Sequence, residues 1–209
     1  EPGVGYNSSI GAPYCTGGSS PCIIGEDLII SRDNLATNEP NSPNTIDGAA
    51  DGTSGTYNTD ESVEAINITD WNESTFASGH LVEISVKVHC WDSGPTDDVI
   101  NIITANNFTS PSWTVQDSFT CQNAGFNIFK TNITIPSAEE FAVRGLIEYQ
   151  GDSTITSISS AYGDQDDVGI PLDNTPPNII LDNPENNNSE ISPGTNIEFL
   201  FNDKEDNFD

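Results

Sequence analysis

The residues that could bind a metal ion gather in two acidic segments of the sequence. Residues 39–61 mix carboxylates and side-chain amides with glycines, a composition that fits neither a helix nor a strand, and the second segment is the run 164–167. Ca²⁺ takes about six to eight oxygen ligands from flexible loops of this kind, whereas Mg²⁺ prefers octahedral sites that keep several waters. We therefore predict one shared Ca²⁺ site, or two neighbouring ones, that attach the long loop 39–61 to the β-strands of the domain. The candidate ligands are Asn44, Asp47, Asp51, Asp60, Glu61, Asp164, Asp166 and Asp167. The alternative is a solvated acidic loop.

The sequence supports a catalytic site less well than a metal site. Paired carboxylates could serve glycoside hydrolysis, but among 33 acidic residues such pairs are unavoidable. His80 and His89 fall on one strand-like run, where nine residues span about 30 Å, too far for a shared metal. No G-x-S-x-G nucleophile elbow is present in the sequence. We therefore expect a protein that is not an enzyme.

The charge of the chain restricts its partners. With 33 acidic and 5 basic residues the formal net charge is -28. Nucleic acids and anionic membranes bind through Lys and Arg, so neither is expected as a partner. No run of 18 apolar residues is present, and membrane insertion is not expected either. Self-repulsion destabilises a compact state, and bound divalent cations would relieve it. A halophilic surface would explain the same composition, although the acids cluster rather than spread.

The cysteines indicate an oxidising compartment. An even set of four has no zinc-type spacing, so disulfides are the better interpretation, with three possible connectivities. Cys15 and Cys22 bracket a turn-rich segment, while Cys90 and Cys121 end or interrupt strand-like runs, and we predict the pairs Cys15–Cys22 and Cys90–Cys121. Together with a first residue Glu1 and no methionine, this favours a secreted protein whose signal segment has been removed. Six sequons are candidates for N-glycosylation: Asn7, Asn67, Asn72, Asn107, Asn132 and Asn187.

The elements that must position these residues have the character of β-strands. Short runs with period-two alternation or β-branched enrichment are separated by Gly, Pro and Ser punctuation, and no segment carries a capped helical period. The predicted strands are 27–31, 62–69, 80–90, 98–105, 112–119, 126–135, 140–150, 153–159 and 167–171. We predict an all-β protein with a jelly-roll-like sandwich over residues 26–171, preceded by an arm with a small disulfide loop over residues 1–25.

A different organisation is expected over residues 172–209. A Pro-Pro linker is followed by two apolar strands, which resembles the start of the Ig-like repeats found in tandem in large secreted bacterial and archaeal proteins. Two strands cannot bury a core alone. A neighbouring copy could cover them by strand addition, which would give a head-to-tail homopolymer; the alternative is that the chain continues. The apolar residues of this assembly interface are Ile179, Ile180, Leu181, Ile197, Phe199 and Phe201.

Several blocks between residues 26 and 171 carry a further resemblance. The runs 39–48, 51–57 and 60–62, and later 142–144, 149–151 and 162–167, resemble a module of secreted, multidomain bacterial and archaeal surface proteins. That resemblance implies a jelly-roll β-sandwich whose acidic blocks carry cations, fused to Ig-like repeats. Members often have a cysteine at the position of Ala49, so a family disulfide in this loop is missing here.

These expectations combine into one leading hypothesis of function. The chain is expected to be a non-enzymatic extracellular structural protein, a subunit of a cell-surface fibre or pilus-like filament stabilised by Ca²⁺, disulfides and N-glycans. The alternative is a carbohydrate-binding or adhesive module of a larger secreted enzyme. In that case Trp71, Trp91 and Trp113 would stack on sugars, although packing in the core is the simpler role for each of them.

Overall fold

The chain is all-β. The computed structural model describes residues 3–32, 39–71 and 75–175, and the chain through Asp173 forms one compact unit, with Asn174–Asp209 as a second. The expected strands at 179–181 and 197–201 lie outside the described residues. The strands are β1 (Val4–Asn7), β2 (Ala12–Cys15), β3 (Cys22–Ile24), β4 (Ser62–Asp70), β5 (Leu81–Cys90), β6 (Asp98–Ala105), β7 (Thr114–Thr120), β8 (Gly125–Thr134), β9 (Glu140–Tyr149) and β10 (Gly163–Pro171), with short 3-10 turns at Thr16–Gly18 and Pro95–Asp97.

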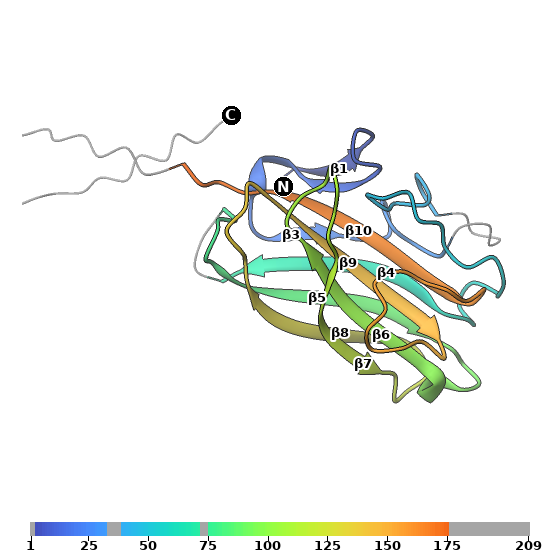
Figure 1. The fold of residues 1–209 in the computed structure, drawn as a ribbon. Helices are drawn as coiled ribbons and strands as arrows, with labels where there is room; N and C mark the ends of the chain where they lie inside the picture. Colours follow the sequence, from blue (N-terminus) through green and yellow to red (C-terminus); the bar gives the residue numbers. More distant parts are fainter. Residues whose placement is uncertain (1–2, 33–38, 72–74, 176–209) are drawn as a thin grey trace, which may run out of the picture. The chain divides into compact units, whose positions relative to one another are not determined.

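Two sheets form a sandwich, which confirms the predicted fold class. One sheet has the strand order β1-β2-β10-β9-β6-β7 and the other β3-β4-β5-β8 (Figure 1). Neighbouring strands are antiparallel except β2 and β10, which run parallel and place Tyr14 beside Gly169. No helix in the described part of the chain is long and apolar enough to cross a bilayer.

The core lies between the sheets and follows the strand alternation read from the sequence. On β5 the buried residues Val82, Ile84, Val86 and Val88 face the other sheet, because successive side chains on a strand point to opposite faces. On β9 the inward row contains Gly145, where a methyl group would lie 2.9 Å from Cγ1 of Val86. The two sheets therefore approach closely at this point, and only glycine fits between them.

Most predicted strands are confirmed, and two are wrong. Residues 27–31 form a turn in which Gly25 accepts from the amides of Leu28 and Ile29, and residues 153–159 form turns outside the six-stranded sheet. Both segments carry the β-branched enrichment or period-two alternation of a strand, but their backbone groups are bonded within turns or to other side chains. Residues 1–25 are not a separate arm, because they supply β1, β2 and β3 to both sheets. The disulfides are Cys15–Cys22 and Cys90–Cys121, as predicted.

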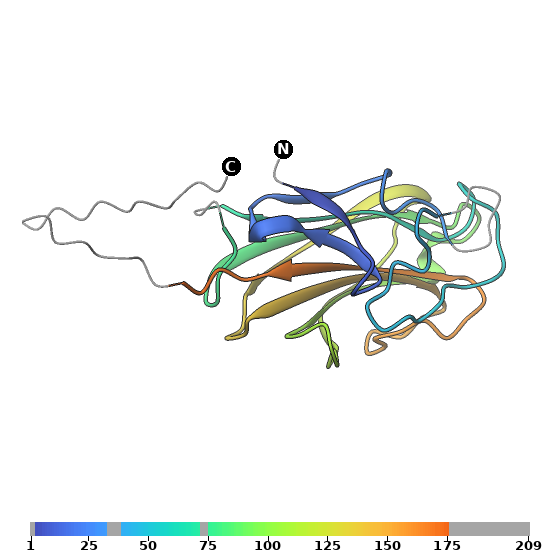
Figure 2. The same ribbon diagram turned by 90° about the horizontal axis from the view of Figure 1, so that it is seen from above.

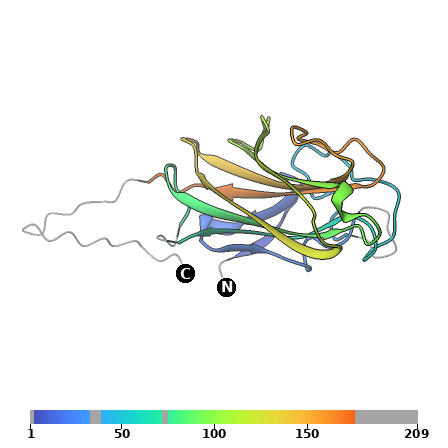
Figure 3. The same cartoon turned by 90° about the horizontal axis from the view of Figure 1, so that it is seen from below.

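Long loops gather at one end of the sandwich, where β9 ends and β10 begins. Figure 2 and Figure 3 show residues 39–61 and 150–162 together at this end. Backbone hydrogen bonds join the two loops: the amide of Gly52 donates to Gly163 O at 2.9 Å, and that of Ser54 donates to Ala161 O at 3.0 Å. The acidic loop is thus attached to the start of β10, the strand that carries the second acidic run.

Candidate cation site

Strand β10 divides its acidic residues between the two faces of the sheet. In the register with β9, Asp164 lies opposite Ile147 and Asp166 opposite Gly145, so both carboxylates point between the sheets. Asp167 lies opposite Arg144 and points outward. Each of these aspartates is fully buried. The run 164–167 was interpreted as one group of ligands, but its alternation sends neighbouring residues to opposite sides.

Five residues make up what we call the interior acid cluster: Glu39, Asn44, Asp51, Asp164 and Asp166. All are buried, and the first three come from the acidic loop. Asp51 Oδ1 accepts from the amide of Gln165 at 3.3 Å, and the Asn44 amide group donates to Glu39. The main chain adds a bond from the Asp167 amide to Asn44 O at 2.9 Å. The structure therefore brings loop and strand together, as the sequence indicated.

The interior acid cluster is electrostatically unfavourable as a set of bare carboxylates. Burial, with the nearby charges of Asp51 and Glu39, raises the pKa of Asp164 well above its usual value. Burial and the charges of Glu39 and Asp164 do the same to the pKa of Asp166. Oδ1 of Asp164 and Oδ1 of Asn44 accept no hydrogen bond, and the hydrogen bond between Asp166 and Glu39 requires that one of these two carboxyl groups is protonated. Buried oxygens of this kind need a proton or a cation.

One basic side chain of the protein is close enough to offset part of the negative charge of the interior acid cluster. Among the basic residues of the described ranges, Lys87 pairs with Glu26 at 3.7 Å and Lys130 with Glu83 at 2.8 Å, both on the four-stranded sheet. The guanidinium of Arg144 lies on the outer face. The remaining one, Arg32, is buried, donates to Ser54 O at 2.8 Å, and lowers the pKa of Asp164 through its charge. One guanidinium cannot neutralise four carboxylates, so a strong negative field remains inside the sandwich.

The donor set of the interior acid cluster fits a hard cation. It offers carboxylate and amide oxygens, without sulfur or imidazole, which are the ligands that Ca²⁺ takes. In the described ranges, one group of Cys, His, Asp or Glu residues brings three ligand atoms within 4.8 Å of one another, namely Cys90, Asp98 and Cys121. Those two sulfur atoms are bonded to each other, so they offer no thiolate. The carboxylates of the interior acid cluster stand further apart, and water or main-chain oxygens would have to complete a shell.

Asp47 and Asp167 belong to a second group on the outer face, centred on the fully buried Arg144. The Arg144 guanidinium donates to both oxygens of Asp167, at 2.7 and 2.9 Å, and to Asp47 at 2.8 Å. The Trp113 ring lies over it at 4.2 Å, and its Nε1 donates to Asp47 at 2.9 Å. Burial opposes ionisation of Asp47, but its hydrogen bond to Arg144 and the charge of that guanidinium leave its pKa lowered overall. These two predicted metal ligands are therefore engaged in ion pairs.

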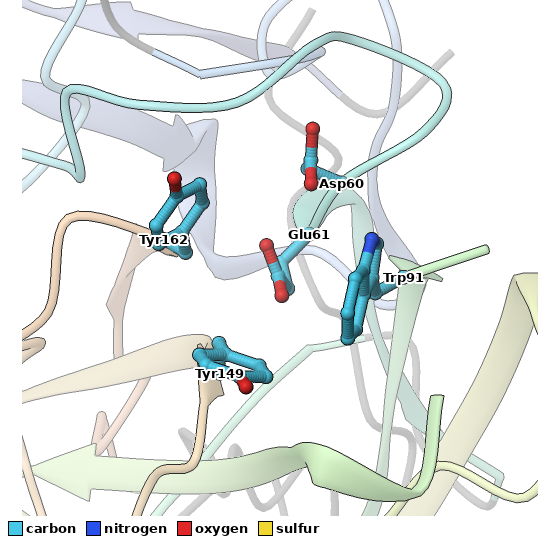
Figure 4. A pocket seen from close by; sticks show the side chains of 5 residues that line it. All are labelled: Asp60, Glu61, Trp91, Tyr149 and Tyr162. Atoms are coloured by element: carbon cyan, nitrogen blue, oxygen red, sulfur yellow. The ribbon is translucent and has the colours of Figure 1, made fainter. Parts of the chain in front are cut away.

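Asp60 and Glu61 lie in a third place, a pocket at the loop-bearing end of the sandwich. Figure 4 shows the carboxylate of Glu61 among the rings of Trp91, Tyr149 and Tyr162, with Asp60 at the edge of this group. Burial is the main reason that the pKa of Glu61 is raised to about 8, and the charge of Asp98 contributes. The eight predicted ligands thus separate into three groups, of which four residues share the interior acid cluster.

Sequence reasoning missed two members of this region, Glu39 and Arg32. Glu39 begins the acidic segment, but it precedes two prolines and was not assigned a role. Arg32 is one of two arginines in a chain with 33 acids, and this rarity was the available signal. Among the predicted glycosylation sites, Asn132 is exposed, and Asn7, Asn67 and Asn107 are partly exposed. Asn72, Asn187 and the six residues of the expected assembly interface lie outside the described residues.

Neither a protein-family model nor a curated protein sequence matches this chain. Its function must therefore be argued from the geometry of its own residues.

Proposed function

We propose that this chain is a non-enzymatic structural protein of an extracellular surface, whose β-sandwich is stabilised by Ca²⁺. The observation that carries this proposal is the interior acid cluster, in which four buried carboxylates share one guanidinium. Ca²⁺ bound by Glu39, Asn44, Asp51, Asp164 and Asp166 would replace repulsion with attraction and tie the loop to β10. The two disulfides support an oxidising compartment.

The carboxylates of the described residues have structural surroundings that support a non-catalytic role. Asp47 and Asp167 hold the buried Arg144, and Asp164 accepts from the amide of Val63 in the opposite sheet. His80 pairs with Asp70 at 2.7 Å, and His89 lies 3.0 Å from the carbonyl of Asp60. Each of these contacts joins two parts of the fold, and none combines a nucleophile with a base.

Thermal unfolding in Ca²⁺ and in a chelator tests the cation directly. A ligand present at about 100 to 1,000 times its Kd stabilises the native state by about 3 to 4 kcal/mol. For a domain of this size, each kcal/mol shifts Tm by about 2–4 °C, so we expect a rise of about 10 °C in Ca²⁺. Mg²⁺ at the same concentration is the control and should give a smaller shift. An identical Tm in Ca²⁺ and chelator would contradict the proposal.

We further propose that copies of the chain assemble head to tail into a fibre, with residues 173–209 of one copy completing the next. The sandwich offers β1, β3, β7 and β8 as the outer strands of its sheets, and Ile23 on β3 is exposed. An outer strand with unpaired backbone groups can accept a further strand. Electron microscopy of the full chain in Ca²⁺ should show filaments, which Ile180→Asp and Phe199→Asp should abolish. Monodisperse monomers at high concentration would contradict assembly.

The carbohydrate-binding alternative rests on Trp71, whose side chain is 70% exposed. Trp71 follows the end of β4 and Trp91 the end of β5. These strands are antiparallel, with Asp70 opposite Val82, so the two tryptophans lie at opposite ends of the sheet. They form no joint stacking platform. Glycan-array binding that Trp71→Ala removes would favour this alternative over a purely structural role.

A further inference from the structure

The pocket that holds Asp60 and Glu61 has the composition of an aromatic cage. Its volume is about 280 Å³, and it is lined by Asp60, Glu61, Trp91, Tyr149 and Tyr162. The ring planes of Trp91 and Tyr149 meet at 84°, and those of Tyr149 and Tyr162 at 75°. Rings at such angles form the walls of a box, whereas a sugar-binding platform would present them side by side.

Glu61 lies within this box. Glu61 is 1% exposed. Figure 4 places its carboxylate between Trp91 and Tyr162, with Tyr149 beside it. The carboxyl groups of Glu61 and Asp98 are hydrogen-bonded to each other, which requires that one of the two is protonated. A buried acidic pair of this kind beside an aromatic pocket is suited to a positively charged guest, whose charge would favour the ionised form of both groups.

The walls are fixed by the fold before any ligand binds. A methyl group on Gly94 would lie 2.6 Å from Cζ3 of Trp91, so the indole packs directly against this glycine. The Tyr149 amide donates to Tyr162 O at 2.9 Å, which holds the two tyrosines together. The Trp91 amide donates to Asp98 Oδ2 at 2.7 Å. The indole of Trp91 and the backbone of the two tyrosines are thus in place before a guest binds, which lowers the entropic cost of binding.

We propose that this pocket binds the alkylammonium group of an organic cation. Aromatic faces attract cations through their quadrupole, and alkylated ammonium groups are the guests that aromatic cages recognise. The carboxylate of Asp60 adds charge attraction, as does Glu61 once it is ionised, within a chain whose net charge of -28 concentrates cations around it. The guest could be a free choline-like molecule or the methylated lysine side chain of a partner protein, because both present the same group.

Calorimetric titration of the full chain at physiological ionic strength tests this proposal. The probes are tetramethylammonium, choline and a trimethyllysine peptide, with 3,3-dimethylbutanol as the neutral isostere of choline. We expect one site per chain and, for the isostere, binding at least about tenfold weaker. Tighter binding of the peptide than of choline would identify a protein side chain as the guest, and the reverse order a free cation.

Matched variants assign the binding to the pocket. Trp91→Ala and Tyr162→Ala should each weaken tetramethylammonium binding by about tenfold, and Trp71→Ala should leave it unchanged. Glu61→Gln tests the carboxylate, and circular dichroism establishes that each variant is folded. Equal binding of the isostere, unchanged binding in Trp91→Ala, or displacement of the guest by glucose or by Ca²⁺ would overturn the proposal. Because the interior acid cluster shares none of these residues, a failure here would leave the Ca²⁺ proposal standing.

Discussion

Replacing Asp166 with asparagine should stabilise the protein in a chelator, and Ca²⁺ should abolish most of that difference from the wild type. Asp166 is fully buried on the inner face of β10, and its pKa is raised well above that of an ordinary aspartate. In a chelator, the wild type must keep this buried carboxyl protonated, and Asp166→Asn removes that cost, so it should stabilise the fold. In Ca²⁺ the same change removes a ligand, so the difference in stability between the two proteins should fall to near zero.

The size of the effect follows from the linkage between proton binding and folding. An unfolded aspartate has a pKa of about 3.9, so keeping one carboxyl protonated at pH 7 costs about 4 kcal/mol. Because the folded pKa of Asp166 is raised, the native state binds more protons than the unfolded state above about pH 4, and stability falls as pH rises. In chelator the two proteins should be equally stable near pH 4, and Asp166→Asn more stable by up to about 4 kcal/mol at pH 7.

Urea unfolding, followed by tryptophan fluorescence across this pH range, measures the difference. In saturating Ca²⁺ the wild type should regain about 3 to 4 kcal/mol, and Asp166→Asn much less. The exposed Asp27 provides the matched control, since Asp27→Asn makes the same chemical change outside the core. The reasoning is refuted if Asp166→Asn destabilises the protein equally in Ca²⁺ and in chelator, or if the two proteins show the same pH dependence in chelator.

Three further predictions concern other parts of the molecule. Arg144→Met should lower the free energy of unfolding in urea by about 3–5 kcal/mol, because it leaves buried carboxylates without their cation. An unchanged urea midpoint would show that the ion pairs contribute nothing. Removing the disulfide with Cys90→Ala and Cys121→Ala should cost about 2–5 kcal/mol, since it closes a long loop, and a thermal scan with the same Tm would contradict this. Tetramethylammonium should bind more tightly as pH rises through about 8, where Glu61, beside Asp98, ionises. Glu61→Gln should remove that dependence, and a flat profile in the wild type would count against the assignment.

Most of the fold was predicted from the alternation of apolar and polar residues along the strands. The runs at β4 and β5 alternate apolar and polar residues, and one face of each strand is buried against the core. The runs at β6 and β9 are richer in apolar residues, and both faces of these central strands are buried. The segments 27–31 and 153–159 contain apolar residues too, but their backbone groups are satisfied in turns, a choice made by tertiary contacts. The short strands β1 to β3 lacked periodicity because each has three or four residues.

The candidate site was predicted in part. The errors arose because successive side chains on β10 point to opposite faces of the sheet. The association between the acidic loop and residues 164–167 could be expected from charge and oxygen-rich side chains. Once β10 is known to begin at Gly163, its alternation alone separates Asp164 and Asp166 from Asp167. The partner of Asp167 could not be identified from sequence, because it depends on which strand lies beside β10. Register, rather than composition, decides which acids share a site.

The parallel pairing of β2 with β10 also affects when this protein can finish folding. It joins Tyr14 to Gly169, and a methyl group on Gly169 would lie 2.6 Å from Cδ1 of Ile10, so the contact is close. Synthesis begins at the N-terminus, so β1 and β2 leave the ribosome early. The central strands of their sheet, β9 and β10, are made much later. Contacts this distant in sequence close slowly. The pair of β1 and β2 must therefore wait for β10 through most of synthesis, when the strong negative charge of the chain helps to keep unfinished copies apart.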